Sequence, residues 1–165
     1  MKVLCFFSVS KQVFTRASSY FFEHAVRLSN FTNRTFFIDG FECAGIEGFL
    51  QALKASSLSE QQMVCGLNGG EAKEWGKNKN EWKIRQILYW DTKPYGRLSR
   101  SYHQLITRMY DEVFQQDPSF CSDLKMIGHE EICYTIGKCD PSDTVLTELE
   151  MLYQINRLRI KAFLG

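Results

Sequence analysis

One stretch of the sequence constrains the fold more than any other, because residues 98–116 carry apolar side chains on one side of a helix. The apolar positions recur at the helical spacing of three or four residues: Leu98, Tyr102, Leu105, Ile106, Met109, Tyr110, Val113 and Phe114. A helix with a single apolar face owes most of its stability in water to packing of that face. The pattern therefore predicts a long helix lying against a core supplied by the rest of the chain.

The chain before this helix begins with a β-rich part. Strands are predicted in residues 3–9, 18–22 and 34–38, which are dense in Phe and Val, and Asp39-Gly40 is a typical turn. From Gly45 onward the apolar spacing becomes helical. The segments that follow are predicted as a helix over residues 59–64 capped by Ser59, a break at Gly69-Gly70 with a restart over 71–76, and an apolar segment of mostly helical spacing over 82–90.

The chain after the long helix is predicted to be mostly helical too. Asp117 and Pro118 are an N-cap and a first-turn proline for a short helix, and residues 132–136 are predicted as a strand. A turn over residues 141–143 precedes a last helix from 144 to about 163. The fold class is therefore α+β, a mostly helical single domain over residues 1–165 with a small β-rich N-terminal part.

Composition excludes several classes of protein. With 165 residues, 44% of them hydrophobic and 24% charged, the chain can bury a full core, which excludes disordered and fibrous chains. The net charge of +1 is too small for a protein that coats nucleic acid, although recognition of one modified nucleotide remains compatible with it. No segment is long and apolar enough to span a membrane, so a cytoplasmic location is expected.

The six cysteines and three histidines show no metal-ligand spacing, and no CxxC pair occurs. Free thiols in a reducing compartment are expected, without a disulfide framework, a structural metal or a cofactor.

The segment after Gly45 carries the main candidate site. Its apolar stripe, which would face the core, consists of Ile46, Phe49, Leu50 and Leu53. Glu47, Gln51 and Lys54 form a second stripe beside it, at i, i+4 and i+7. Gly48 costs about 1 kcal/mol against alanine inside a helix, which suggests close approach of another chain segment or a ligand. The alternative from this pattern alone is an ordinary surface helix with a Glu–Lys face.

Two further polar clusters are less specific. Asp140 to Asp143 and the following Thr144 to Glu150 fit plain helix capping, and Ser29-Asn30-Phe31 indicates only a loop.

Taken together, these motifs resemble the NADAR family, whose members include YbiA-like N-glycosidases. The resemblance covers about residues 27–159. The shared pattern runs in order through Ser29-Asn30-Phe31, Asp39-Gly40, Glu47 with Gln51 and Lys54, Ala72-Lys73 with Gly76, Trp82, Asp143 with Thr147 and Glu148, and residues 152–159. Gly48 stands where many relatives have His, and Thr144 follows Asp143 where the riboflavin-pathway branch has a Trp-Gly pair. The chain therefore looks more similar to members that remove ADP-ribose from guanine bases, some of which are antitoxins of DarT-type DNA ADP-ribosyltransferases.

The resemblance implies hydrolysis of an N-glycosidic bond, which passes through an oxocarbenium-like state that a fixed carboxylate can stabilise. Glu47 is the candidate for that carboxylate, Lys54 for a phosphate ligand or an amine nucleophile, and Asp143 for a group that orients water or ribose. The expected substrate-binding residues are Ser29, Asn30, Phe31, Gln51, Trp90 and Thr147. The expected partners are ADP-ribose on guanine of DNA or RNA and a DarT-type toxin.

Two other functions stay open at this point. One is an N-glycosidase acting on a small phosphorylated riboside, as in riboflavin synthesis, and the other is a non-catalytic ADP-ribose binding module. The joint presence of Glu47, Lys54 and Asp143 favours an enzyme over a binding module.

Overall fold

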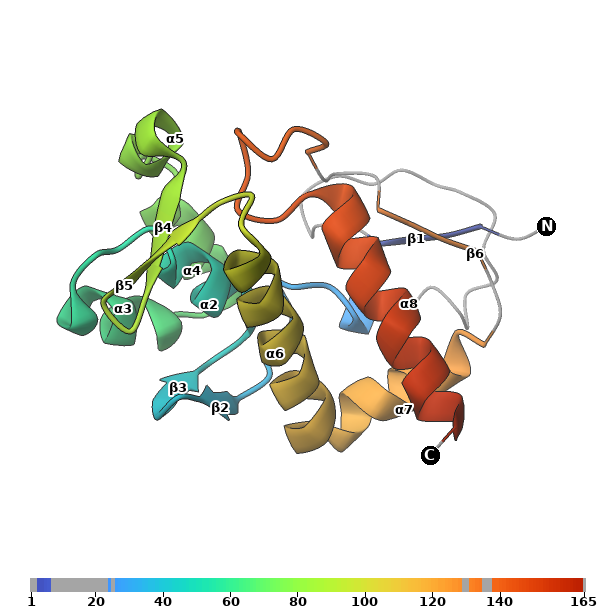
Figure 1. Ribbon diagram of the computed structural model, residues 1–165. Coiled ribbons are helices and arrows are strands. Elements are labelled where there is room, and N and C mark those ends of the chain that lie inside the picture. The colour runs from blue at the N-terminus through green and yellow to red at the C-terminus, as the bar shows by residue number, and fades with distance from the viewer. Residues whose placement is uncertain (1–2, 7–23, 25, 129–130, 135–137, 165) are drawn as a thin grey trace.

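The computed structural model describes residues 3–6, 24, 26–128, 131–134 and 138–164, and it is an α+β fold in which helices predominate (Figure 1). The helices are α2 (Ile46–Ala52), α3 (Leu58–Cys65), α4 (Gly69–Gly76), α5 (Glu81–Arg85), α6 (Arg100–Gln116), α7 (Pro118–Met126) and α8 (Glu148–Leu164). Within the described residues, β1 (Val3–Phe6) pairs in parallel with β6 (Glu131–Tyr134), while β2 (Phe36–Ile38) with β3 (Phe41–Cys43) and β4 (Ile87–Trp90) with β5 (Lys93–Gly96) form antiparallel pairs. The predicted fold class is confirmed.

The long amphipathic helix is α6, which lies in the middle of the molecule in Figure 1. The short helices α2 to α5 with β4 and β5 lie on one side of it, and α7, α8 and the β1–β6 pair lie on the other. Its buried residues are Tyr102, Leu105, Ile106, Met109, Tyr110 and Val113, as the apolar spacing predicts. The predicted start is wrong by two residues, because Ser99 caps the helix and Leu98 lies before it, 68% exposed.

The β-rich beginning is confirmed where the structure describes it. Strand β1 occupies part of the predicted segment 3–9 and β2 lies within 34–38, whereas residues 18–22 lie outside the described residues. Asp39 and Gly40 form the predicted turn with positive φ angles of 51° and 83°. Asp117 caps α7 and Pro118 is its first residue, as predicted.

Two predicted helix starts are wrong by a few residues. Ser57, not Ser59, caps α3, because its side chain accepts a hydrogen bond from the backbone amide of Glu60. The two glycines at 69 and 70 do not interrupt the helix but begin α4. Asn68 and Glu71 form a capping box at this end, in which the side chain of each residue accepts a hydrogen bond from the backbone amide of the other.

Residues 82–90 do not form one helix. Helix α5 ends where Gln86 adopts a left-handed conformation with φ of 53°, and the chain then enters β4. The helical spacing of the apolar residues is misleading here, since alternate residues of β4 are buried and the segment is short.

The last helix begins at Glu148, four residues later than the sequence predicts. Thr147 and Glu150 bond each other's backbone amides through their side chains, which is the arrangement of a capping box. Residues 144–147 therefore precede the helix instead of forming its first turn. No helix among the described residues has the length and apolarity that crossing a bilayer requires.

Candidate active site

A cavity of about 480 Å³ lies between the short helices and the segment that leads into α8. Its volume is in the range of small-molecule binding sites, roughly 300–1,000 Å³. Five of the nine predicted site residues line it: Asn30, Glu47, Gln51, Lys54 and Asp143. The structure therefore gathers into one cavity residues that are more than 100 positions apart in sequence.

Glu47 lies in the first turn of α2 and is 5% exposed. Its carboxylate accepts a hydrogen bond of 2.7 Å from Gln51 Nε2, one turn further along the helix. The ammonium group of Lys73 on α4 lies 3.7 Å from the same oxygen. A buried carboxylate with one amide and one cation beside it is a fixed negative charge in the cavity wall.

The amide oxygen of Gln51, Oε1, lies close to Gly76 of α4. A Cβ atom added at Gly76 would lie 1.7 Å from Gln51 Oε1, so glycine leaves room for this side chain in its present position. Gln51 Oε1 is buried and has no hydrogen-bond partner among the residues that the structure describes. Buried polar atoms are normally paired, so an unpaired one beside a cavity suggests a ligand group that completes it.

Lys54 follows α2, and its ammonium group donates a hydrogen bond of 2.8 Å to the carbonyl of Gly76. Burial lowers the pKa of Lys54 to about 8, and the positive charge of Lys73 adds to the lowering, whereas Glu47 opposes it. Near neutral pH this lysine is therefore a cation that loses its proton more readily than an ordinary lysine.

The loop at residues 29–31 packs against the start of α2. The backbone amide of Glu47 donates to the carbonyl of Asn30, and the Asn30 side chain accepts a hydrogen bond of 2.9 Å from Tyr110 of α6. Ser29 is buried and accepts a hydrogen bond from the amide of Phe31. The loop thus fixes Glu47, and of its three predicted residues only Asn30 lines the cavity.

Asp143 lies where residues 138–146 approach α5. Lys83 of α5 lies 3.3 Å from its carboxylate, and Gln86 bonds the carbonyl of Ser142. The Asp143 side chain is 56% exposed, so it lines the cavity at its solvent side.

Two further predicted site residues, Trp90 and Thr147, are not among those that line the cavity. Trp90 is 1% exposed and packs in the core against Phe41 and Phe49, with ring centroids 4.5 and 4.6 Å away, and its indole nitrogen bonds Asp39. Its expected role in stacking on a ligand does not fit this position. Thr147 is buried in the cap of α8.

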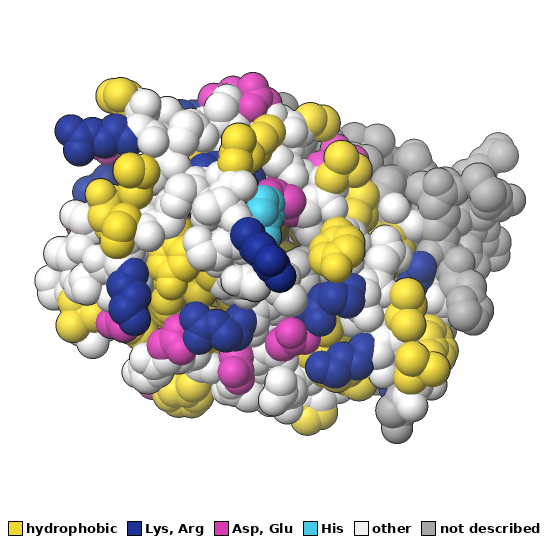
Figure 2. Space-filling view, viewed as in Figure 1, with side chains coloured by type: hydrophobic (Ala, Val, Ile, Leu, Met, Phe, Trp, Pro, Cys, Tyr) yellow, Lys and Arg dark blue, Asp and Glu magenta, His cyan; other side chains and the backbone are white. Residues whose placement is uncertain are grey.

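The sequence interpretation missed most of the basic side chains of the cavity. Five lysines line it: Lys54, Lys73, Lys77, Lys83 and Lys138. The acidic residues that line it are Glu47, Glu74 and Asp143. Over α6 and α8, by contrast, basic and acidic side chains lie side by side (Figure 2), as the pairs of Asp111 with Arg157 and Lys161 illustrate. Lysine density across residues 73–83 was the signal that could have found them.

Trp82 also lines the cavity and was not assigned to the site, although it belongs to the family pattern. It is 6% exposed, and its buried indole nitrogen has no hydrogen-bond partner within the described part of the chain. Trp82 is therefore better placed than Trp90 to contact a ligand base. Among the described residues, no group of three His, Cys, Asp or Glu side chains is arranged to hold a metal ion.

Comparison with known proteins assigns the chain to a family. The model of the family described as bacteriophage protein GP30.3 matches residues 23–160, which is most of the chain. The protein belongs to this family. A relative from Enterobacteria phage T4, named as the uncharacterized 17.1 kDa protein in the Gp30-rIII intergenic region, is 32% identical over 133 residues, which are 80% of this chain and 88% of the relative.

Among solved structures, the NMR structure of the Escherichia coli protein YbiA matches 99% of this chain and 86% of its own, with a TM-score of 0.61 and 14% identity. At this identity the likeness shows the fold alone. The YbiA-like fold that the sequence resemblance implied is thereby confirmed.

Proposed function

We propose that the protein hydrolyses the N-glycosidic bond between ADP-ribose and guanine in modified nucleic acid, and so reverses ADP-ribosylation of the kind a DarT-type toxin produces. The observation that carries the proposal is the buried carboxylate of Glu47 in a cavity lined by five lysines. The negative charge of Glu47 suits a cationic transition state, and the positive charges of the lysines suit an anionic substrate.

Glu47 would stabilise the reacting sugar. As the bond between the anomeric carbon and the guanine nitrogen breaks, positive charge develops on the carbon and ring oxygen. Water then adds to the carbon through its oxygen, one of its protons ends on the guanine nitrogen, and free ADP-ribose is released while the unmodified guanine stays in the nucleic acid. Gln51 fixes one oxygen of the Glu47 carboxylate, which keeps the charge in place before the reaction begins.

The lysines would hold the two phosphates of ADP-ribose. Three of them, Lys73, Lys83 and Lys138, each disfavour the protonated form of Lys54, so their positive charges lie within electrostatic reach of Lys54. A diphosphate relieves this repulsion by pairing with them. Acidic side chains neutralise part of the positive charge of these lysines, because Lys73 pairs with Glu47 and Lys83 pairs with Asp143.

Lys54 has two possible roles in such a reaction. As a cation it binds a phosphate or a ribose hydroxyl, and as a free amine it attacks an opened ribose. The lowered pKa makes the second role accessible at mildly alkaline pH.

The second candidate is an N-glycosidase that acts on a small phosphorylated riboside. The YbiA-like fold favours it, since the NADAR resemblance includes enzymes of that kind. It would use the same Glu47, with one phosphate on the lysines instead of two.

The test is incubation of the purified protein with an oligonucleotide carrying ADP-ribosyl-guanine, and separately with a phosphorylated riboside of the riboflavin pathway. The proposal expects release of ADP-ribose and restored guanine from the first substrate. Cleavage of the riboside alone would replace the proposal by the second candidate, and cleavage of neither would remove both.

A further inference from the structure

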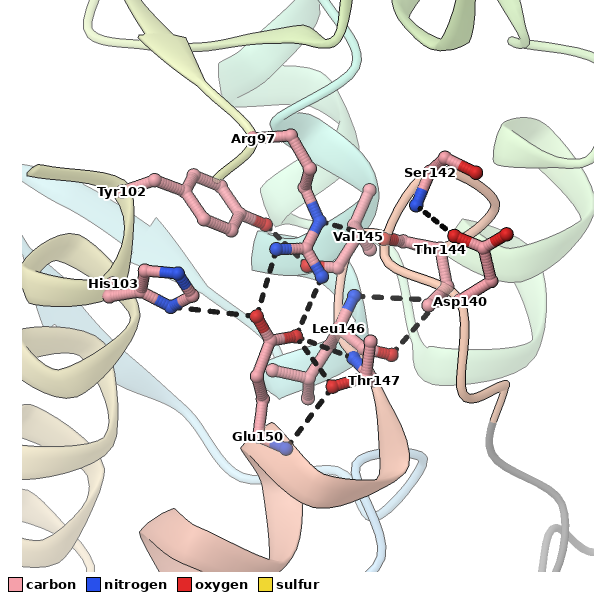
Figure 3. A network of polar contacts seen from close by, with 10 residues as sticks. All are labelled: Arg97, Tyr102, His103, Asp140, Ser142, Thr144, Val145, Leu146, Thr147 and Glu150. Carbon is pink, nitrogen blue, oxygen red and sulfur yellow. Dashed lines mark hydrogen bonds and ion pairs between the residues drawn. The ribbon is translucent and has the colours of Figure 1, made fainter. Parts of the chain in front are cut away.

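Arg97 lies directly after β5 and has no exposed surface, so a full positive charge is buried beside the core. Two of its nitrogens donate hydrogen bonds of 2.9 and 2.6 Å to the two oxygens of Glu150 on α8 (Figure 3). The third nitrogen donates one of 2.8 Å to the carbonyl of Thr144. A buried arginine with all three nitrogens engaged fixes the groups that it contacts.

Glu150 receives more than the arginine. One of its oxygens also accepts hydrogen bonds from the backbone amide and hydroxyl of Thr147, at 2.7 and 3.0 Å. Burial alone would raise the pKa of Glu150, but the hydrogen bonds from Arg97 and Thr147 outweigh it and hold that pKa below its usual value. The carboxylate thus ties β5, α8 and residues 144–147 together.

Residues 144–147 lie outside helix and strand and are held by side chains. Arg97 donates to the backbone carbonyl of Thr144, and the Tyr102 hydroxyl donates to the backbone carbonyl of Val145. Glu150 accepts a hydrogen bond from the backbone amide of Thr147. In Figure 3 these side chains converge on the segment from α6, from the end of β5 and from the start of α8. Thr144, Val145 and Leu146 line the same cavity as Glu47.

We propose that Arg97 and Glu150 are positioning residues, which hold residues 144–147 as the wall of the Glu47 cavity that fits the substrate. The proposal rests on the function proposed above for this cavity. Neither residue lines the cavity. Loss of their contacts therefore loosens the wall and weakens substrate binding, while Glu47 and Lys54 on the other elements keep their positions.

The test compares Glu150→Gln with wild type in three measurements: kcat and KM for ADP-ribosyl-guanosine, melting temperature, and amide hydrogen exchange of residues 144–147. A glutamine amide has one acceptor oxygen where the carboxylate has two, so it cannot keep both hydrogen bonds from Arg97 together with both from Thr147. We expect KM to rise about 10- to 100-fold with little change in kcat, and exchange at Thr147 to accelerate about 10-fold or more. Arg97→Lys, which keeps the charge but loses the forked contact, should act in the same direction.

Asp111→Asn is the matched control, because Asp111 of α6 also pairs with α8, but its partners are Arg157 at 2.7 Å and Lys161 at 3.5 Å instead of residues 144–147. It should lower the melting temperature and leave KM unchanged. An unchanged KM in Glu150→Gln, or an equal rise in Asp111→Asn, would overturn the positioning role. If wild type cleaves no substrate, the proposed function fails by itself, and the exchange rates then decide whether Glu150 orders the wall.

Discussion

The two walls of the cavity are built by different means. On the Glu47 side, short helices meet at glycines: Gly48 lies against backbone carbonyls at the end of α3, and Gly76 lies against Gln51. On the other side, residues 144–147 are fixed by the side chains of Arg97 and Glu150. The contact at Gly48 is with backbone and resists small displacements, whereas a side-chain network can be weakened without moving the backbone elsewhere. The more rigid wall is the one with Glu47, which would carry the reaction, and the wall of residues 144–147 is the one that would fit the substrate.

The largest effect is expected from Glu47→Gln, which removes the charge while keeping size and most hydrogen bonding. Single-turnover cleavage should slow by two to four orders of magnitude, about 3–5 kcal/mol of barrier, since the charge acts mainly in the transition state. Binding of ADP-ribose and the melting temperature should change little. Wild-type turnover with a loss of only about 0.3–1 kcal/mol of stability would mean that Glu47 merely favours the helix dipole.

Gly76→Ala should come next. The new Cβ would overlap the end of the Gln51 side chain, which can rotate away and thereby leave Glu47 without its amide. We expect a fall in kcat of about 10- to 100-fold with a nearly unchanged melting temperature. Gly70→Ala on the same helix is the control, because its nearest neighbour would be an ordinary contact at 3.5 Å. Equal activities in the two variants would show that Gln51 does not support the site.

Gly48→Ala should instead lower stability. A Cβ atom there would meet the carbonyl oxygens of Cys65, Leu67 and Val64 at 2.9, 3.2 and 3.3 Å, and backbone cannot rotate away as a side chain can. The expected loss in the free energy of unfolding is about 1–3 kcal/mol in urea titrations. A variant as stable as wild type would show that α2 and α3 can separate at little cost.

The smallest effect concerns pH. The pKa of Lys54 is about 8 in the folded protein against an ordinary value of 10.5, so its positive charge is lost as pH rises through 8. Affinity for ADP-ribose in calorimetry should therefore fall by a few-fold between pH 7 and pH 9, whereas Lys54→Arg should remove this pH dependence. A turnover number that rises over the same interval would identify the free amine as the reacting species. Affinity that stays flat in the wild type would remove Lys54 from the phosphate contacts.

Lys54 also makes the free energy of unfolding depend on pH, and this dependence has the opposite sign to that of the ligand affinity. Between about pH 8 and 10.5 the unfolded chain retains a proton on Lys54 that the folded protein has lost. Its contribution to the free energy of unfolding therefore rises with pH across this window.

Sequence reasoning worked where a pattern repeats within one element. The apolar spacing of α6 and the pair of Glu47 and Gln51 in α2 depend only on the helical period, so both could be predicted, and Lys54 follows closely enough after α2 to reach the same cavity. The cost of Gly48 also pointed correctly to a close approach, which turned out to be that of the chain segment ending α3. Spacing says nothing, however, about which element lies opposite.

The failures came from contacts between distant segments. Trp90 was expected at the site, but its place in β4 turns it into the core beside Phe41 and Phe49. Lys138 reaches the cavity only because residues 138–146 pack against α5 through Asp143. The start of α8 was placed too early because the capping box of Thr147 and Glu150 competes with the equally plausible turn at residues 141–143.

The central claim is that ADP-ribose binds in the cavity that contains Glu47. Titration of the ¹⁵N-labelled protein with free ADP-ribose, followed by amide chemical shifts, tests it residue by residue. The account predicts saturable shifts at Glu47, Lys73 and Asp143, with little change at Arg157 on the α6–α8 surface. Absence of shifts at millimolar ADP-ribose, or saturable shifts confined to the surface around Arg157, would contradict it.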